Sequence, residues 1–529
     1  MATVSLGSAF GDLDEWPGNL LQADSSTDVT ARSSTELRVR HGEGSPFEGY
    51  RIVVTGSGFT YKDGVPIGGT MSSIRVLAPN GDTVLTFSGL KGPIAGDLPQ
   101  FHANMFGSAN PNAGPGPDGK TTWSHLLSGN DTVRGTGGDD RRTFTGLDSG
   151  DDTYDMGGGD DAVAGSVGDD TYRGGGGYDF LTFRDTTWNE GMSATRGATF
   201  DVGAGRVRDP WGGTDRISGF EAFEGSRFDD TFYGGNDRDD QFSGLRGRDV
   251  IDGGARTFSG GEQTGDDEDL AVYRDDYWNG GRFGVVVDLQ ASASGGSIRG
   301  TARDGSGNRD TLIDVERVEG TRYADSLTGS RVDNQFWGGQ GRDTYAGGAG
   351  SDRVNFDRGL GNQEPGGITV DLGRSSGQVR DDGFGNTESL SGIEEIGGTN
   401  RADRVRMDGG DNAVQAGDGR DVLTGAGGED VFYFIDDFEL GDGDRITDFD
   451  ATGGGRDRLG FDTGNFDGMS TTLRLVNGTG PATGEGTFIF DPSTDTLYWD
   501  RDGTGSAGRQ VVAVLPGVDA LTGANFDLY

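Results

Sequence analysis

The stretch DSGDDTYDMGGGDDAVAGSVGDDTYRGGGGYDF, residues 148–180, repeats on a nine-residue period. Nine residues are too few for a helix and its return. They suffice for a glycine loop of about six residues and a strand of about three, in which one side chain points inward. Two such units make one coil, so residues 18 apart stack on the same edge. The period is carried by an aspartate, at Asp152, Asp161, Asp170 and Asp179, and by an apolar or aromatic residue two positions later, at Tyr154, Val163, Tyr172 and Leu181.

Aspartates stacked in this way require a cation. Like charges on adjacent strands repel one another, and a hard cation held between successive loops turns the repulsion into attraction. Calcium suits such a site best, because it takes about six to eight oxygen ligands, including carbonyls that glycine turns expose. Magnesium prefers a stricter octahedron with bound waters, and zinc prefers His or Cys, which the repeats lack. The alternative is a solvated acidic coil that binds ions loosely.

A longer module of about 80 to 90 residues organises the short period. Between blocks of the short period lies a second unit, seen three times, which opens GATFDV at residue 197, GVVVDL at 284 and GITVDL at 367. Each unit closes with a glutamate, a glycine four residues later and an aspartate five residues after that, which restarts the period. Such repeats predict stacked coils rather than a single globule. The three glutamates are Glu221, Glu316 and Glu394.

The composition fits a chain that cations hold together. Glycine supplies 102 of 529 residues, the formal net charge is −42 and the pI is about 4.2. Such a chain would normally be disordered, but the regular period argues against that. The charge excludes nucleic acid and anionic membranes as partners, and no apolar run approaches the ~18 residues of a membrane span. With no cysteine, disulfides and thiolate metal sites are excluded. The first residues lack the basic start and apolar core of a secretory signal peptide.

Three nonapeptides, GSVGDDTYR (165–173), GGAGSDRVN (347–355) and GAGGEDVFY (425–433), resemble the RTX repeat G-G-x-G-x-D-x-U-x, a hemolysin-type calcium-binding pattern. The resemblance covers roughly residues 127–437. It implies an all-β fold, a parallel β-roll or β-helix solenoid, with several Ca²⁺ ions held by sixth-position aspartates and by carbonyls of the glycine loops. Asn334 and Asn412 depart from aspartate at that position, so the sites that they share are expected to be weaker. The implied metal ligands are Asp131, Asp140, Asp152, Asp161, Asp170, Asp179, Asp230, Asp240, Asp249, Asp269, Asp325, Asp343, Asp352, Asp403, Asp421 and Asp430, with Gly150, Gly159, Gly168, Gly177, Gly341, Gly350 and Gly419.

Three domains are expected. Residues 1–125 hold every lysine and histidine and several β-like runs, which turns such as Asn80–Gly81 separate. They predict a small all-β, sandwich-like domain for recognition or assembly. Residues 126–437 are expected to form the β-roll in four blocks with three intervening β units. Residues 438–529 resemble the C-terminal targeting region of RTX proteins exported by type I secretion, and are also expected to cap the solenoid.

No catalytic motif is present. The H-E-x-x-H of zinc proteases and the G-x-S-x-G elbow are both missing, and the histidines lie outside the repeats. Metal ligation already explains the paired carboxylates, so we assign no catalytic residue and expect no enzyme. Trp188 and Trp278 stand where two blocks end, and would either bind sugar or cap the apolar column.

The expected protein is secreted or lies at the cell surface, and folds on binding calcium after export by the type I secretion machinery. It would act without catalysis, as an adhesin or a surface-layer component, with cell-surface polysaccharide or sister subunits as partners. The alternative is an extracellular carbohydrate-active enzyme, a lyase, epimerase or hydrolase, that uses carboxylates or the N-terminal domain.

Overall fold

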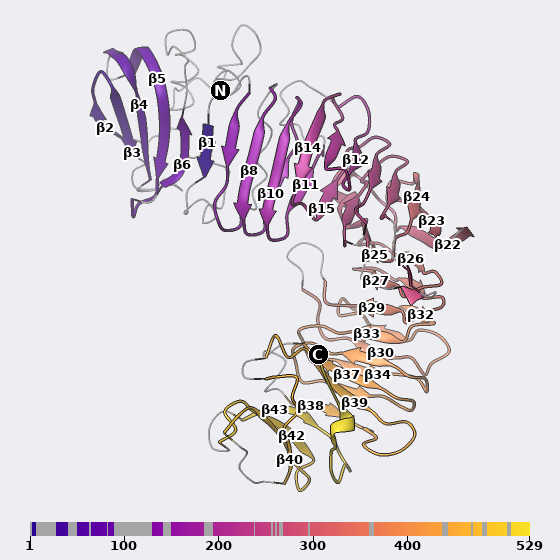
Figure 1. Cartoon of the computed structure of the whole chain (residues 1–529). Coiled ribbons are helices and arrows are strands. Elements are labelled where there is room, and N and C mark those ends of the chain that lie inside the picture. The colour runs from indigo at the N-terminus through magenta and orange to yellow at the C-terminus, as the bar shows by residue number, and fades with distance from the viewer. Residues whose placement is uncertain are drawn as a thin grey trace. The chain divides into compact units, whose positions relative to one another are not determined.

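The nine-residue period folds into short strands that stack in parallel, as a computed structural model of the chain shows (Figure 1). The chain divides into two compact units, Met1–Asp267 and Glu268–Tyr529, which we describe one at a time. Within the described residues there is no α-helix. The described residues are 3–6, 28–40, 50–62, 65–81, 83–88, 130–140, 150–184, 194–236, 238–254, 258–259, 262–263, 268–294, 297–358, 364–435, 443–466, 469–478, 484–504 and 509–529.

The first unit begins with an antiparallel sheet in the order β2-β3-β4-β5-β6-β1. Asn80 and Gly81 make the β5–β6 turn, in which the Gly81 N–H donates to the Ala78 carbonyl at 2.9 Å. Within the described residues, β1 pairs with β6 on one side and with the first roll strand, β7, on the other, so this sheet runs on into the roll. That residues 1–125 form a sandwich-like domain stays a prediction. Its strands are β1 (Thr3–Leu6), β2 (Asp28–Arg32), β3 (Glu36–Arg40), β4 (Arg51–Lys62), β5 (Val65–Leu77) and β6 (Thr83–Ser88).

The roll of the first unit has the predicted two-strand coil. Tyr154 pairs with Tyr172 in one sheet, and Val163 pairs with Leu181 in the other, each 18 residues apart. These inward side chains are fully buried, and the two tyrosine rings stack with centroids 4.9 Å apart. The core is therefore a thin column of side chains between the two sheets, to which most roll strands contribute one large residue. The roll strands are β7 (Thr132–Arg134), β8 (Thr153–Gly158), β9 (Ala162–Ala164), β10 (Thr171–Gly176), β11 (Phe180–Thr182), β15 (Ala222–Glu224), β16 (Thr231–Tyr233), β17 (Gln241–Ser243) and β18 (Val250–Asp252).

The first intervening unit is a three-stranded meander inserted into one edge of the roll. Its strands β12 (Thr199–Asp201), β13 (Arg206–Arg208) and β14 (Thr214–Ser218) pair antiparallel with one another. β14 also pairs in parallel with β10, and β12 with β16, while β11 and β15 pair directly on the opposite edge. The meander thus interrupts one sheet and leaves the other continuous. The first unit also holds a short hairpin of β19 (Phe258–Ser259) and β20 (Glu262–Gln263).

The second unit repeats this plan with two further meanders. Val318 pairs with Phe336 and Phe336 with Val354, so the 18-residue coil is kept. The meanders are β22–β23–β24 and β30–β31, the latter followed by β32. Its strands are β21 (Leu270–Val272), β22 (Val286–Ser294), β23 (Ser297–Arg303), β24 (Arg309–Ile313), β25 (Arg317–Glu319), β26 (Ser326–Thr328), β27 (Gln335–Trp337), β28 (Thr344–Ala346), β29 (Arg353–Asn355), β30 (Thr369–Asp371), β31 (Val379–Asp381), β32 (Ser389–Ser391), β33 (Glu395–Gly397), β34 (Arg404–Arg406), β35 (Ala413–Gln415), β36 (Val422–Thr424) and β37 (Val431–Phe434), with a 3₁₀ helix η1 (Arg274–Asn279).

Residues after 437 extend the stack and then close it. β38 pairs with β36 and β39 with β37, so both sheets gain one more strand. β43 then covers β38, β44 covers β39, and β41–β42–β43 pair antiparallel beside them. This arrangement forms the cap of the second unit. Its elements are β38 (Asp444–Ile446), β39 (Arg458–Phe461), β40 (Leu475–Asn477), β41 (Thr487–Asp491), β42 (Thr496–Asp500), β43 (Arg509–Val514), η2 (Gly523–Asn525) and β44 (Phe526–Leu528).

Candidate metal centre

The sixth-position aspartates form a buried ladder that links each coil to the next. In it, the backbone N–H of one aspartate donates to the Oδ1 atom of the aspartate one coil later. Asp152 donates to Asp170 at 2.7 Å, and Asp161 donates to Asp179 at 2.9 Å. Asp325 donates to Asp343 at 2.8 Å. All sixteen predicted aspartates are buried, with relative exposures of 3% or less: Asp131, Asp140, Asp152, Asp161, Asp170, Asp179, Asp230, Asp240, Asp249, Asp269, Asp325, Asp343, Asp352, Asp403, Asp421 and Asp430.

The intervening units keep the ladder continuous by supplying a glutamate. The N–H groups of Asp179, Asp269 and Asp352 donate to the Oε2 atoms of Glu221, Glu316 and Glu394 at 2.9, 3.0 and 3.0 Å. A glutamate side chain has one more methylene than aspartate, so it reaches the same place from a different backbone position. The recurrent glutamates in the sequence are therefore ladder members.

One oxygen of several ladder carboxylates is left for another ligand. In Asp161, Asp179 and Asp352, Oδ1 accepts the ladder hydrogen bond, while Oδ2 is buried and has no hydrogen-bond partner among the described residues. Burial, together with the neighbouring carboxylates, raises the pKa of Asp161 and of Asp352 to about 7. A divalent cation at these oxygens would offset both effects and hold the groups ionised.

The glycine loops bring carbonyl oxygens to the same edges. The fourth-position glycines Gly168 and Gly177 have φ values of +153° and +129°, in the range that L side chains rarely adopt. A Cβ on Gly168 would lie 1.8 Å from the Gly150 carbonyl oxygen one coil earlier, and one on Gly177 would lie 2.2 Å from that of Gly159. Glycine is thus required both for the turn and for the close approach of successive loops. Among the other predicted glycines, Gly159, Gly341, Gly350 and Gly419 also have positive φ, whereas Gly150 does not.

This donor set fits calcium. Within the described residues, no three Asp, Glu, His or Cys side chains converge on one metal position. A cation here would therefore take the ladder carboxylates together with loop carbonyls, an all-oxygen set of the kind that calcium accepts. Bound calcium would neutralise the ladder and cross-link adjacent coils.

The meanders contribute carboxylates that the nine-residue period did not predict. Asp215 accepts the Asp170 N–H at 2.9 Å, and burial, with Asp170 and Asp209 nearby, raises its pKa to about 9. In the third meander, Glu388 is 2% exposed, lies against Asp343, and neither of its oxygens has a hydrogen-bond donor within the described residues. A regular spacing in the sequence could have revealed these meander carboxylates, because an acidic residue recurs every six positions in each meander. The three series are Asp209, Asp215 and Glu221; Asp304, Asp310 and Glu316; and Asp382, Glu388 and Glu394.

The ladder also continues past residue 437. The Asp421 N–H donates to Asp444 at 3.0 Å, and the Asp430 N–H donates to Asp457 at 3.1 Å. The spacings are 23 and 27 residues, so the nine-residue period could not predict these two members.

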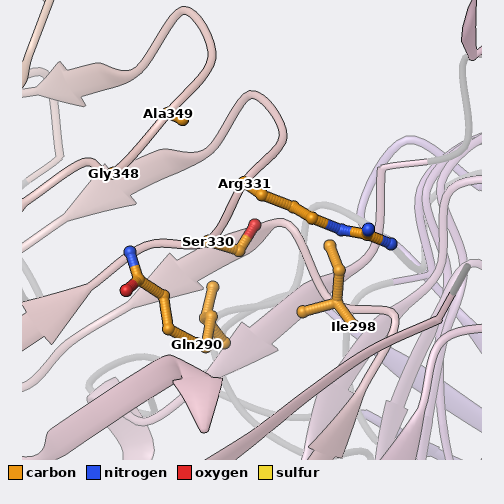
Figure 2. A pocket seen from close by; sticks show the side chains of 7 residues that line it. Gln290, Ile298, Ser330, Arg331, Gly348 and Ala349 are labelled. Carbon is orange, nitrogen blue, oxygen red and sulfur yellow. The ribbon is translucent and has the colours of Figure 1, made fainter. Parts of the chain in front are cut away.

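Two hollows lie on the units. One of about 560 Å³ in the first unit is lined by the ladder carboxylates Asp152 and Asp215, among other residues. The other, of about 440 Å³, lies in the second unit between the β22–β23 hairpin and two glycine loops. Figure 2 shows two of its lining side chains, Gln290 at the left and Arg331 further right, with Ile298 below Arg331. Its lining contains no carboxylate and no histidine.

Other residues singled out in the sequence carry less information. The histidines His41, His102 and His125 and Trp188 lie outside the described residues. Trp278 lies in η1, but its side chain is not among those described. Their roles stay predictions. In the part of the chain that the structure describes, no helix is long and apolar enough to cross a membrane.

Comparison with known families supports this interpretation. The RTX calcium-binding nonapeptide repeat matches residues 127–141, 217–240, 235–255, 319–354 and 407–434. The stretch at 148–180 lies outside these segments, yet it forms the same coils and ladder. No curated protein matches the chain. The chain thus carries repeats of the RTX calcium-binding type, and they form a parallel β-roll.

Proposed function

We propose that this protein is a secreted scaffold that folds when it meets calcium outside the cell and acts without catalysis, as an adhesin or surface-layer component. The observation that carries the proposal is the buried carboxylate ladder, with Asp161, Asp179 and Asp352 each keeping one oxygen that has no hydrogen-bond partner among the described residues. Extracellular calcium modules bind at roughly 10⁻⁴–10⁻³ M. The ladder would therefore be filled outside the cell and largely empty inside.

Export before folding follows from the same coupling. A chain of formal net charge −42, with a core of single side chains, gains little from folding until the cation arrives. Residues 438–529 would direct it to the type I secretion machinery. The same residues would cap the folded roll once calcium is bound.

Recognition would belong to residues 1–125. The roll commits its aspartates to the ladder and its apolar residues to the inner column, which leaves a short-chain, repetitive surface. The N-terminal sheet has long strands, with β4 and β5 spanning 12 and 13 residues. Its edge and loops would bind cell-surface polysaccharide or a sister subunit.

The test uses the full-length protein and whole cells or isolated surface polysaccharide. We expect retention in about 2 mM calcium and release in excess chelator, with the polymer unchanged. Release of reducing ends or unsaturated sugars from the polymer would instead support the carbohydrate-active enzyme. Equal retention with and without calcium would contradict the scaffold proposal.

A further inference from the structure

At three places along the ladder, a side-chain N–H group bridges two successive coils. Each of these places lies one coil after the glutamate of an intervening unit. The donors are Arg238, which follows Glu221, Asn334, which follows Glu316, and Asn412, which follows Glu394. Each donates to a backbone carbonyl of the preceding coil, 18 residues back. The recurrence in all three modules points to a common role.

The guanidinium of Arg238 lies where two coils of the first unit meet. Its Nε is 2.8 Å from Asp240 Oδ1, and its Nη2 donates to the Phe220 carbonyl at 2.5 Å. The same Nη2 is 3.8 Å from Glu221 Oε1. One positive group therefore contacts a loop carbonyl and two ladder carboxylates from successive coils. These are the kinds of oxygen that a calcium ion would take between the coils.

The position of Arg238 in the repeat makes this contact unusual. It is the fourth residue of its nonapeptide, 235–243, where the RTX pattern has glycine. Its side chain folds back over the first residue, since a Cβ on Gly235 would lie 2.4 Å from Arg238 Cδ. Arg401 occupies the fourth position of another nonapeptide, 398–406, but points outward. Its side chain is 61% exposed and lies 3.6 Å from Glu364.

Asn334 and Asn412 also contact a carbonyl of the preceding coil, but with an uncharged amide group. Asn334 Nδ2 donates to the Glu316 carbonyl at 3.0 Å, and Asn412 Nδ2 donates to the Glu394 carbonyl at 3.4 Å. Both side chains are buried. The amide N–H group lies against the carbonyl oxygen, at the place that a cation bound to this oxygen would occupy. The amide also brings no negative charge to attract one.

We propose that Arg238, Asn334 and Asn412 take the place of calcium at these three steps, so that each intervening unit is joined to the following block without metal. The inference rests on the proposed calcium-dependent ladder, and refines where in it the ions bind. The joint in the first unit is an internal ion pair, and the two joints in the second unit are hydrogen bonds. The remaining steps of the ladder would still depend on calcium.

The experiment counts bound calcium per full-length chain by equilibrium dialysis with Ca²⁺ as the probe. Arg238→Gly restores the repeat pattern and frees two carboxylates, and Asn334→Asp restores the missing carboxylate. Each is expected to bind one calcium ion more than the unsubstituted protein. Arg401→Gly is the matched control, because it removes an arginine from the same repeat position without uncovering ladder oxygens, and the count should stay the same.

The outcomes separate the two levels of the proposal. An unsubstituted protein that binds no calcium would overturn the proposed function itself. The second outcome concerns only the three joints. They would be overturned if the unsubstituted protein binds calcium while Arg238→Gly and Asn334→Asp fold and bind the same number of calcium ions as it does. If Arg238→Gly does not fold, Asn334→Asp decides, since it changes one atom of a buried side chain and keeps its shape. An equal gain in Arg401→Gly would also contradict the inference.

Discussion

In Asp161, Asp179 and Asp352, the two carboxylate oxygens have separate tasks. Oδ1 accepts the backbone N–H of the preceding coil, and the buried Oδ2 is left for a ligand. The nine-residue spacing was enough to predict these residues, because period and stacking are linked directly. It could not predict Arg238 or Asp215. Whether an arginine turns inward, or a meander carboxylate reaches the ladder, depends on how distant coils pack.

The substitution Asp343→Ala should weaken calcium-dependent folding more than Asn334→Ala. Asp343 accepts the Asp325 N–H at 2.8 Å and supplies charge to its edge, whereas Asn334 supplies only hydrogen bonds. We expect the calcium midpoint of folding to rise at least about tenfold for Asp343→Ala, or ~1.4 kcal/mol, and less than about threefold for Asn334→Ala. Circular dichroism at increasing calcium measures both, and equal shifts would show that the register is misassigned.

Calcium affinity should fall as the pH is lowered from about 8 to 6. Burial raises the pKa of Asp343 to about 8, and of Asp352 and Asp430 to about 7, in the folded chain without metal. The unfolded value is about 3.9. The stability that these carboxyls give the metal-free fold is therefore fully present below pH 4 and lost as the pH rises through 7–8. Calcium must displace their protons, so its midpoint should decrease steadily from pH 6 to 8. A midpoint independent of pH would contradict this.

At the scale of elements, the period predicted the short strands and the coil, while the meanders appeared only as repeated openings and closings. GATFDV, GVVVDL and GITVDL become β12, β22 and β30, each pairing in parallel with a roll strand and antiparallel with its own meander. Their hydrophobic pattern resembles that of the roll strands, so direction could not be read from it. The tail was predicted as a cap, but its link to the last coils through β43 and β44 depends on long-range pairing.

Deleting residues 438–529 should block export and leave calcium binding in the remaining chain. The deletion removes β38 and β39, which cover the last roll strands, and the ladder members Asp444 and Asp457. The count of bound calcium should therefore fall without reaching zero. Immunoblots of medium and cells, with dialysis of the protein recovered from cells, measure both. A truncated chain in the medium at the level of the full-length chain would show that the tail serves only as a cap.

At the scale of the whole molecule, the two units share one principle of cohesion. Each stacks coils around a column of single buried side chains, and each carries the ladder along the loops. With 87 acidic and 45 basic residues, the chain holds far more negative charge than its own cations can neutralise. The joints at Arg238, Asn334 and Asn412 would reduce the repulsion between carboxylates only where these three residues lie. Calcium is thus expected to decide between the folded and unfolded chain.

The most direct test of this central claim is a calcium titration of the full-length protein from excess chelator, followed by far-ultraviolet circular dichroism and size-exclusion chromatography. The account predicts an expanded, largely unfolded chain in chelator that becomes compact and rich in β-structure at roughly 10⁻⁴–10⁻³ M calcium, with no comparable change in magnesium. A native β-spectrum and a compact elution volume in excess chelator would contradict it.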